Sequence, residues 1–181
     1  MSKIIWHVTM SVDGFIAGRD DSMDWAFGTS HDGGLVDEIR EGTGAILAGR
    51  RWYEVASRKY DGVAGIYGGA WTGPVFVITH RPGEVPDDPT VTFVSGDLVD
   101  AVARARETAA SGNVEIFGAN TAQGCLEAGL LDELVIHVAP VLLGEGVRLY
   151  GAPGATDQVE LARTDTSDPG QVADLRLRVV R

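Results

Sequence analysis

The order in which apolar, β-branched runs and helical segments follow one another restricts the fold of this chain more than any other feature. Runs typical of buried strands occur at residues 4–12, 45–48, 75–79, 91–95, 114–117 and 133–139. Segments with helical spacing occur at residues 34–41, 50–56, 97–112 and 118–129. Strands that are apolar on both faces suit the middle of a parallel sheet, and helices between them cover its two faces. The sequence therefore predicts an α/β fold with a mostly parallel sheet.

The end of the chain departs from this alternation. Residues 159–166 and 172–180 each alternate apolar and polar side chains, and the turn sequence Asp168-Pro169-Gly170 lies between them. This pattern predicts an antiparallel hairpin at one edge of a mixed sheet. Residues 17–30 and the glycine-rich residues 61–73 are expected to be loops. No internal repeat or linker divides the sequence, so we expect a single domain over residues 1–181.

Charge and cysteine content narrow the choice of partners. With 181 residues and a net charge of −11, the chain should repel a phosphate backbone, so no nucleic-acid partner is expected. A local field can still favour one small anion. The single cysteine, Cys125, excludes an intrachain disulfide and a multi-cysteine metal site, and it fits a reducing compartment. We find no signal peptide and no run of roughly 18 apolar residues, and therefore expect a cytoplasmic protein without a metal or a membrane partner.

Glycine and polar residues directly follow three of the predicted strands. They are Gly49, Arg50 and Arg51 after residues 45–48, then Thr79, His80 and Arg81 after residues 75–78, and Gly118, Ala119, Asn120 and Thr121 after residues 114–117. Open α/β sheets bind ligands at the carboxyl ends of their strands, where helix N-termini offer unpaired amides to anions. Together the three strand ends suit a ligand with several phosphates.

Each of these residues also has an ordinary structural interpretation. The arginine pair suits a solvated loop, His80 suits an exposed loop, and Gly118 suits close packing of a helix on a strand. The recurrence of the pattern at several strand ends is what favours a function. The sequence contains neither GxGxxG after the first strand nor GxxxxGK[ST] anywhere. A conventional dinucleotide-binding Rossmann domain and a P-loop enzyme are therefore not expected.

Three segments, in order along the chain, resemble a known family. Residues 10–17 (MSVDGFIA) resemble the opening strand and turn of the family that contains the reductase domain of the bifunctional riboflavin-biosynthesis deaminase-reductase and its stand-alone relatives. Residues 49–54 (GRRWYE) resemble the glycine-arginine segment that this family shares with dihydrofolate reductase. Residues 139–146 (APVLLGEG) are similar to the family's segment after its late strand. The resemblance implies a dihydrofolate-reductase-like, three-layer α/β/α fold.

The resemblance also implies NADPH as the hydride donor. Residues matching 49–51 would hold the cofactor phosphates, those matching 79–81 would flank the adenosine 2′-phosphate, and those matching 118–121 would offer helix amides to the pyrophosphate. An arginine contact to the 2′-phosphate is the usual basis for preferring NADPH over NADH. The chain departs from the family at Gly118-Ala119, where the family often has two glycines. It also has no deaminase half, since one cysteine cannot build that zinc site.

Reduction of a C=N or C=O bond requires a proton, which a carboxyl group with a raised pKa in an apolar cleft could supply. The candidates are Asp13 at the end of the first strand, Asp24 in the long loop and Asp32 before the first helix. Asp32 lies near the position of the acid in dihydrofolate reductase. A turn-forming role for Asp13 and a helix N-cap role for Asp32 are equally open. Trp25 and Phe27 are candidates to stack on a flat substrate, or alternatively to fill the core.

Three functions remain open. Reduction of a phosphoribosylamino-pyrimidine in riboflavin synthesis should require a further basic group in the cleft, such as Lys59, Arg58 or Arg148. Reduction of dihydrofolate or another pterin requires a buried carboxylate that faces the amino group of the ring. A non-catalytic sensor would bind NADPH without consuming it. A homodimer is also expected, because reductases that this chain resembles often pair. The apolar residues 138–143 and the C-terminal hairpin could supply the surface for pairing, or residues 138–143 could belong to the core.

Overall fold

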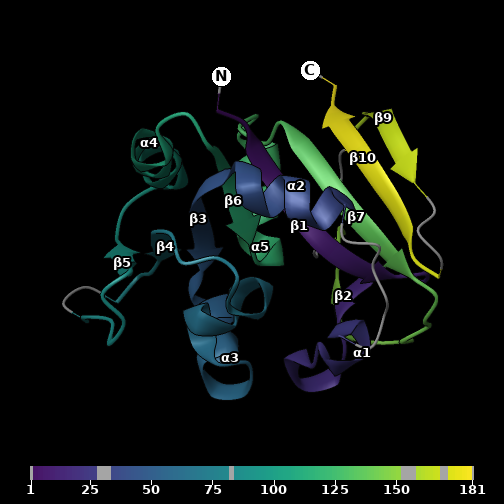
Figure 1. Cartoon of the computed structure of the whole chain (residues 1–181), viewed down its shortest axis with the longest axis horizontal. Coiled ribbons are helices and arrows are strands. Elements are labelled where there is room, and N and C mark those ends of the chain that lie inside the picture. The colour runs from purple at the N-terminus through teal and green to yellow at the C-terminus, as the bar shows by residue number, and fades with distance from the viewer. Residues whose placement is uncertain (1, 28–33, 82–83, 152–157, 168–170, 181) are drawn as a thin grey trace.

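The architecture follows from a computed structural model that describes residues 2–27, 34–81, 84–151, 158–167 and 171–180. Eight strands form one sheet (Figure 1). In spatial order they are β5 (Val91–Val94), β4 (Val75–Ile78), β3 (Thr43–Gly49), β6 (Asn113–Phe117), β1 (Ile4–Ser11), β7 (Glu133–Ala139), β10 (Ala173–Val179) and β9 (Leu161–Ser167). The strands from β5 to β7 are parallel, and β10 and β9 add antiparallel pairs at one edge. Both the mostly parallel sheet and the C-terminal hairpin are thereby confirmed.

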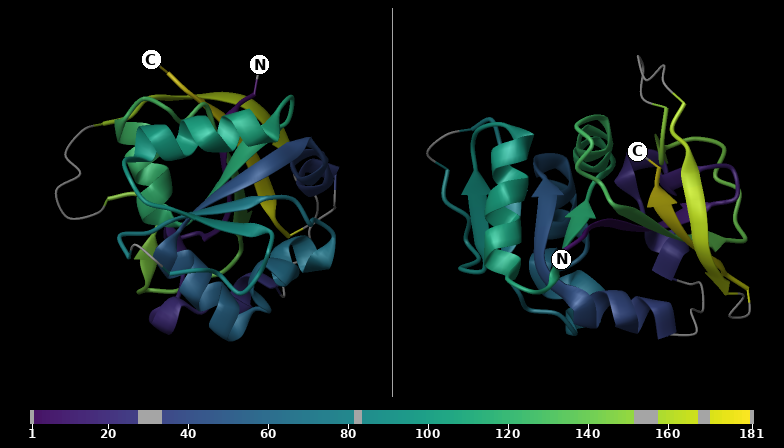
Figure 2. Two further views of the ribbon diagram at one scale, coloured as in Figure 1. Left: turned by 90° about the vertical axis from the view of Figure 1, so that its left-hand side faces the viewer. Right: turned by 90° about the horizontal axis from the view of Figure 1, so that it is seen from above.

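Helices cover both faces of the sheet, as Figure 2 shows in its right-hand view. On one face, α4 (Leu98–Ala109) and α5 (Ala119–Glu127) pack against strand residues that include Trp6 and Leu47. Asp97 caps α4, because its side chain accepts a hydrogen bond from the Asp100 amide at 2.8 Å. On the other face, α2 (Gly34–Gly42) buries Ile39 against β1 and β7. The three-layer α/β/α arrangement is confirmed.

Two segments expected to be loops contain short helical turns. Residues 17–30 include η1 (Arg19–Asp21) and α1 (Asp24–Phe27), and residues 61–73 include η2 (Gly62–Gly69). Such turns need only local hydrogen bonds and little apolar periodicity, so the pattern of the sequence does not reveal them. The sequence also missed a small second sheet, in which β2 (Phe15–Ala17) pairs with β8 (Val147–Arg148). Helix α3 (Arg50–Lys59) extends three residues beyond its predicted end.

None of the helices in the described part of the chain is long and apolar enough to cross a membrane. Cys125 is buried in α5, and burial raises the pKa of its thiol to about 12. A thiol with this pKa stays protonated at neutral pH and behaves as a small apolar side chain.

Candidate active site

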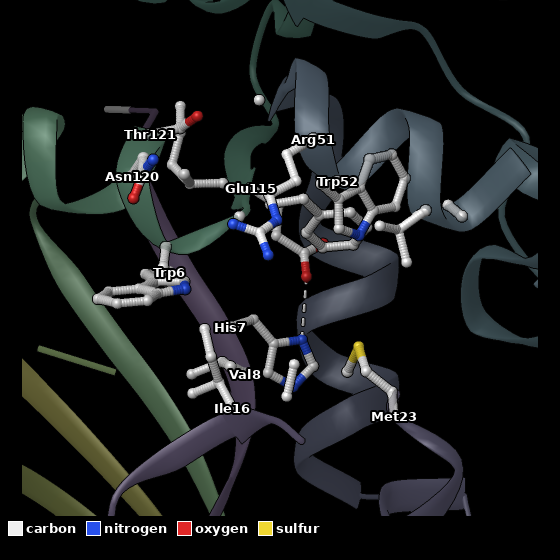
Figure 3. Close-up of a pocket in the computed structure, with 18 of the residues that line it drawn as sticks. Trp6, His7, Val8, Ile16, Met23, Arg51, Trp52, Glu115, Asn120 and Thr121 are labelled. Atoms are coloured by element: carbon white, nitrogen blue, oxygen red, sulfur yellow. Dashed lines mark hydrogen bonds and ion pairs between the residues drawn. The ribbon is translucent and has the colours of Figure 1, made fainter. Parts of the chain in front are cut away.

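A cavity of about 1010 Å³ opens at the carboxyl ends of β4, β3 and β6 and continues along β1 (Figure 3). This volume is at the upper end of the range for small-molecule sites. The starts of α3 and α5 line one part of the cavity, and residues of η1, α1 and η2 line another. Every strand end that the sequence singled out contributes to it, through Gly49, His80 and Gly118 among others.

The β3–α3 and β6–α5 junctions touch each other in this cavity. A Cβ atom added to Gly49 would lie 2.7 Å from the Thr121 hydroxyl, and one added to Gly118 would lie 3.8 Å from the Gly49 nitrogen. Gly118 has a φ of +96°, which favours glycine, and the peptide that joins it to Ala119 is trans. Neither helix has a side-chain hydrogen bond at its N-cap. Two helix N-termini therefore present backbone amides at one place, an arrangement suited to phosphate.

The two adjacent arginines have different surroundings. The guanidinium of Arg51 projects into the cavity (Figure 3) and pairs at 2.8 Å with Asp21, a lining residue that the sequence analysis missed. Arg50 also lines the cavity, but its guanidinium is bonded to Glu54 at 3.0 Å and to Glu84 at 2.6 Å. Arg51 therefore has the charge more available to an incoming anion.

At the end of β4, Arg81 forms an ion pair with the same Glu54 carboxylate that binds Arg50. Arg81 pairs with Glu54 at 3.0 Å, so Arg50 and Arg81 share one carboxylate. The hydrogen bond from Arg50 is the main cause that holds the pKa of Glu54 below its usual value. Thr79 is buried, and its hydroxyl accepts a hydrogen bond from the Arg81 amide at 3.1 Å. The structure thus brings these basic groups together beside the cavity.

Five side chains that the sequence analysis missed form a polar row across the sheet. Thr43, Glu115, His7, His137 and Asp174 come from β3, β6, β1, β7 and β10, which are consecutive strands. We call them the polar row. Three of the four titratable members, His7, Glu115 and His137, occupy positions in otherwise mainly apolar strands, whereas Asp174 lies in the alternating strand β10. That pattern was the available signal, because a polar residue in a buried strand needs a hydrogen-bonding partner.

Tyr67, from η2, joins the polar row at the cavity. Its hydroxyl donates a hydrogen bond to Glu115 at 2.8 Å and also lies 2.8 Å from His7 Nδ1. Burial and the Glu115 carboxylate both raise the pKa of Tyr67 far above its usual value, so the phenol stays neutral. His7, Tyr67, Glu115 and His137 all line the cavity. Its interior therefore combines apolar walls with one connected group of buried acids and bases.

The three aspartates proposed as proton donors are placed differently. Asp13 does not line the cavity, and it accepts hydrogen bonds from the Ser11 hydroxyl at 2.6 Å and the Gly144 amide at 2.7 Å. Asp24 is exposed and bonds Ser22 and Tyr60 at the surface. Asp32 lies outside the described residues. The contacts of Asp13 are those of a turn former that joins the end of β1 to residues 143–144.

The pKa of Asp13 makes a proton-donor role unfavourable. The hydrogen bonds from Ser11 and Gly144 lower it from 3.8 to about 2, so the carboxyl group is ionised at neutral pH. A group with a lowered pKa stabilises the fold above its ordinary pKa, and that stabilisation is lost as the pH falls through about 2. Asp13→Asn should therefore lower the melting temperature at pH 7 and have little effect near pH 2. Glu107→Gln, which removes an exposed carboxylate of α4, is the control; a pH-independent loss for Asp13→Asn would contradict this account.

The two aromatic residues proposed to stack on a substrate, Trp25 and Phe27, differ in whether they line the cavity. Phe27 lines the cavity, is 68% exposed and packs against Tyr60 with ring centroids 5.3 Å apart. Trp25 is not among the lining residues, and its indole donates a hydrogen bond to the Ser22 carbonyl at 3.2 Å. Only Phe27 is positioned to contact a bound molecule in this conformation.

Comparisons with known proteins agree with this architecture. The model of the RibD C-terminal domain family matches residues 2–173. Among curated proteins, the uncharacterized YwjB of Bacillus subtilis is 27% identical over 96% of this chain and 95% of its own. A second curated protein of Bacillus subtilis, the uncharacterized YyaP, is 22% identical to this chain over 94% of this chain and 92% of YyaP.

Solved structures with riboflavin-biosynthesis or reductase names superpose over at least 99% of this chain. A Shewanella sp. PV-4 protein with a provisional riboflavin-biosynthesis name is 26% identical, with full coverage of both chains and a TM-score of 0.78. The Thermotoga maritima deaminase and 5-amino-6-(5-phosphoribosylamino)uracil reductase is 15% identical, with a TM-score of 0.70 over 99% of this chain and 57% of that one. The riboflavin biosynthesis reductase Rib7 of Saccharomyces cerevisiae is 16% identical, with a TM-score of 0.64 over 99% and 90%. With its family model matched from residue 2 to residue 173, this chain belongs to the RibD C-terminal domain family.

Proposed function

We propose that this protein is an NADPH-dependent reductase that transfers a hydride to a small heterocycle, such as a phosphoribosylamino-pyrimidine. One observation carries the proposal: a single cavity joins a phosphate-type site, made of two uncapped helix N-termini and Arg51, to a buried cluster of acids and bases. The names of the Thermotoga and yeast proteins, both reductases, support the same reaction class.

The residues around the two junctions fit a dinucleotide. Because Gly49 and Gly118 have no side chain, the two junctions approach each other closely, and the amides at the starts of α3 and α5 would bind the pyrophosphate. Arg51 and His80, which line the cavity, would contact a phosphate and the 2′-phosphate respectively, and Arg81, which pairs with Glu54 beside the cavity, would flank the 2′-phosphate. Bound there, NADPH would supply the hydride. The chain's own contribution is to orient the two reactants, to exclude water with the apolar walls, and to provide a proton.

The position of Glu115 favours a second substrate class, the pterins. Glu115 is buried and lines the cavity, and a carboxylate there can accept hydrogen bonds from the amino group of a flat ring. The basic groups expected for a ribose phosphate, Lys59, Arg58 and Arg148, are not among the lining residues of the described chain. A pterin and a phosphoribosylamino-pyrimidine are therefore the two substrate types to compare.

The homodimer stays a prediction. Leu142, which lies in the surface expected to form the dimer, is 74% exposed.

Cofactor titration and turnover test the proposal. We expect NADPH to bind with micromolar or better affinity and at least about tenfold more tightly than NADH, because a charge-assisted contact to the 2′-phosphate contributes about 1.5–3 kcal/mol. The binding is followed by fluorescence, and the oxidation of NADPH is measured with a panel of pyrimidine and pterin substrates. Equal affinities for NADPH and NADH would contradict the 2′-phosphate site. Tight binding without any turnover would identify a sensor instead of an enzyme.

A further inference from the structure

The polar row is connected by hydrogen bonds from one end to the other. Asp174 Oδ1 lies 2.6 Å from His137 Nδ1, and His137 Nε2 lies 2.6 Å from His7 Nε2. His7 Nδ1 lies 3.0 Å from Glu115 Oε1, and Glu115 Oε2 accepts a hydrogen bond from Thr43 at 3.2 Å. The four titratable side chains are at most 8% exposed. Burial at this level requires that every polar atom find a partner.

The contact between the two imidazoles determines how many protons the row holds. Two nitrogen lone pairs repel each other at 2.6 Å, so one proton must lie between the Nε2 atoms of His7 and His137. A carboxylate accepts hydrogen bonds, so His137 Nδ1 carries a proton that it donates to Asp174, and His7 Nδ1 carries one that it donates to Glu115. In this loaded state the two imidazoles together carry one positive charge between two carboxylates.

The row can release one proton without breaking the imidazole contact. If the proton on His7 Nδ1 leaves through the Tyr67 hydroxyl, the bridging proton moves from His137 Nε2 to His7 Nε2. His7 then donates to His137 across the same 2.6 Å contact, and the Tyr67 hydroxyl, 2.8 Å from both His7 Nδ1 and Glu115 Oε1, shares its proton between these two acceptors. Both imidazoles are then neutral, and each buried group still has a hydrogen-bonding partner. The geometry is therefore compatible with both the loaded and the discharged state.

We propose that His7 supplies the proton for the reduced substrate through the Tyr67 hydroxyl, and that His137 and Asp174 reload His7 across the sheet. This inference rests on the proposed reductase function. When the hydride adds to the carbon of a C=N or C=O bond, the π electron pair moves to the heteroatom, which takes the hydroxyl proton of Tyr67 while that hydroxyl takes the proton from His7 Nδ1, 2.8 Å away. His137 passes the bridging proton to His7 Nε2, and water later returns one proton to the pair. Tyr67 and His7 act as the catalytic residues, while His137 and Asp174 are positioning residues.

The charged groups around the pair come from several elements. Glu115 faces it from β6, Asp174 from β10 and Tyr67 from η2, and Arg40 of α2 is close enough to influence Tyr67. Two carboxylates and one phenol therefore face the pair, on which the loaded state places one positive charge. None of the three aspartates proposed from the sequence is needed in this scheme.

The bridging proton can be tested in the ligand-free protein. In the full chain labelled with ¹⁵N, a proton shared by His7 and His137 should produce a scalar coupling between their two Nε2 nuclei. The His31→Gln and His80→Gln variants assign the signals of the other two histidines. We expect the coupling in the wild type and its loss in His137→Gln, whose circular dichroism spectrum confirms folding. A wild-type spectrum without the coupling would overturn the shared proton, whatever the activity.

The donor role is tested by kinetics. His137→Gln and Asp174→Asn should each lower kcat at least about 100-fold, the usual contribution of general acid catalysis, while the Kd of NADPH changes less than about threefold because neither residue is near the phosphate site. The solvent deuterium isotope effect on kcat should increase, because proton delivery becomes limiting. Glu133→Gln is the matched control: this buried carboxylate, on the same strand as His137, bonds Lys3 and Arg176 away from the cavity. It should keep kcat within about threefold.

The outcomes separate this inference from the proposed function. If His137→Gln and Asp174→Asn both keep the kcat of the wild type, the proposed proton transfer across the polar row is wrong, while the proposed reductase function stands. If Glu133→Gln loses as much kcat as the two row variants, and none of them changes the solvent deuterium isotope effect, the polar row has only a structural role and the donor assignment is wrong. If the wild type oxidises NADPH with no substrate of the panel, the reductase function and the donor role both fail.

Discussion

Gly49→Ala is expected to weaken NADPH binding at least about tenfold, or roughly 1.4 kcal/mol. The new methyl group would lie 2.7 Å from the Thr121 hydroxyl, so the Thr121 side chain or the starts of α3 and α5 must shift. The backbone of Gly49, with φ −82° and ψ 153°, is one that alanine adopts without strain. The effect is therefore steric, and it acts on the relative position of the two sets of phosphate-binding amides. Fluorescence titration with NADPH measures it.

A second substitution isolates the cause. The added Cβ would lie 4.0 Å from the Thr121 Cβ, which is an ordinary contact, so Thr121→Ala removes the clashing oxygen and leaves enough room. We expect the Gly49→Ala/Thr121→Ala double variant to recover most of the lost affinity, and Thr121→Ala alone to have a smaller effect than Gly49→Ala. A double variant no better than Gly49→Ala would show that separation of the two helix N-termini is not what weakens binding.

Replacing Arg50 and Arg51 together by alanine should raise the KM for NADPH at least about tenfold, because each charge-assisted contact contributes about 1.5–3 kcal/mol. The kcat should change much less, since contacts to remote phosphates stabilise ground and transition states alike. Steady-state kinetics with varied NADPH separates the two parameters. A fall in kcat with an unchanged KM would place these arginines in a different role.

The Arg50→Ala and Arg51→Ala single variants should raise the KM for NADPH by different amounts. Arg51 projects into the cavity, and its removal also leaves the Asp21 carboxylate unpaired there, so Arg51→Ala should account for most of the change. Arg50 is already neutralised by Glu54 and Glu84, so Arg50→Ala should have the smaller effect. Arg58→Ala is the control, because it removes the same charge from the exposed end of the same helix. A larger effect from Arg50 than from Arg51 would contradict this assignment.

Local patterns were sufficient for the main elements of the fold. Apolar runs such as residues 75–78 became buried strands, the capping aspartate Asp97 begins α4, and the alternation near the C-terminus became β9 and β10. These features depend on neighbours a few residues away, so their signals are contained in short windows. Short turns such as η1 and η2 depend on left-handed residues, including Asp20 and Tyr67, that have no comparable periodic signal.

For the site, the sequence by itself located the strand ends, because a glycine directly follows an apolar run at Gly49 and at Gly118. Only the tertiary structure decided which charges remain available, since Glu54 and Glu84 neutralise Arg50 while Arg51 faces the cavity. It also assembled the polar row, whose ends at Thr43 and Asp174 are far apart in the chain. No window of sequence contains that row, because strand order across the sheet differs from strand order along the chain. The physical reason is that the hydrogen-bonding needs of buried side chains are met by partners that only the register of five neighbouring strands brings together.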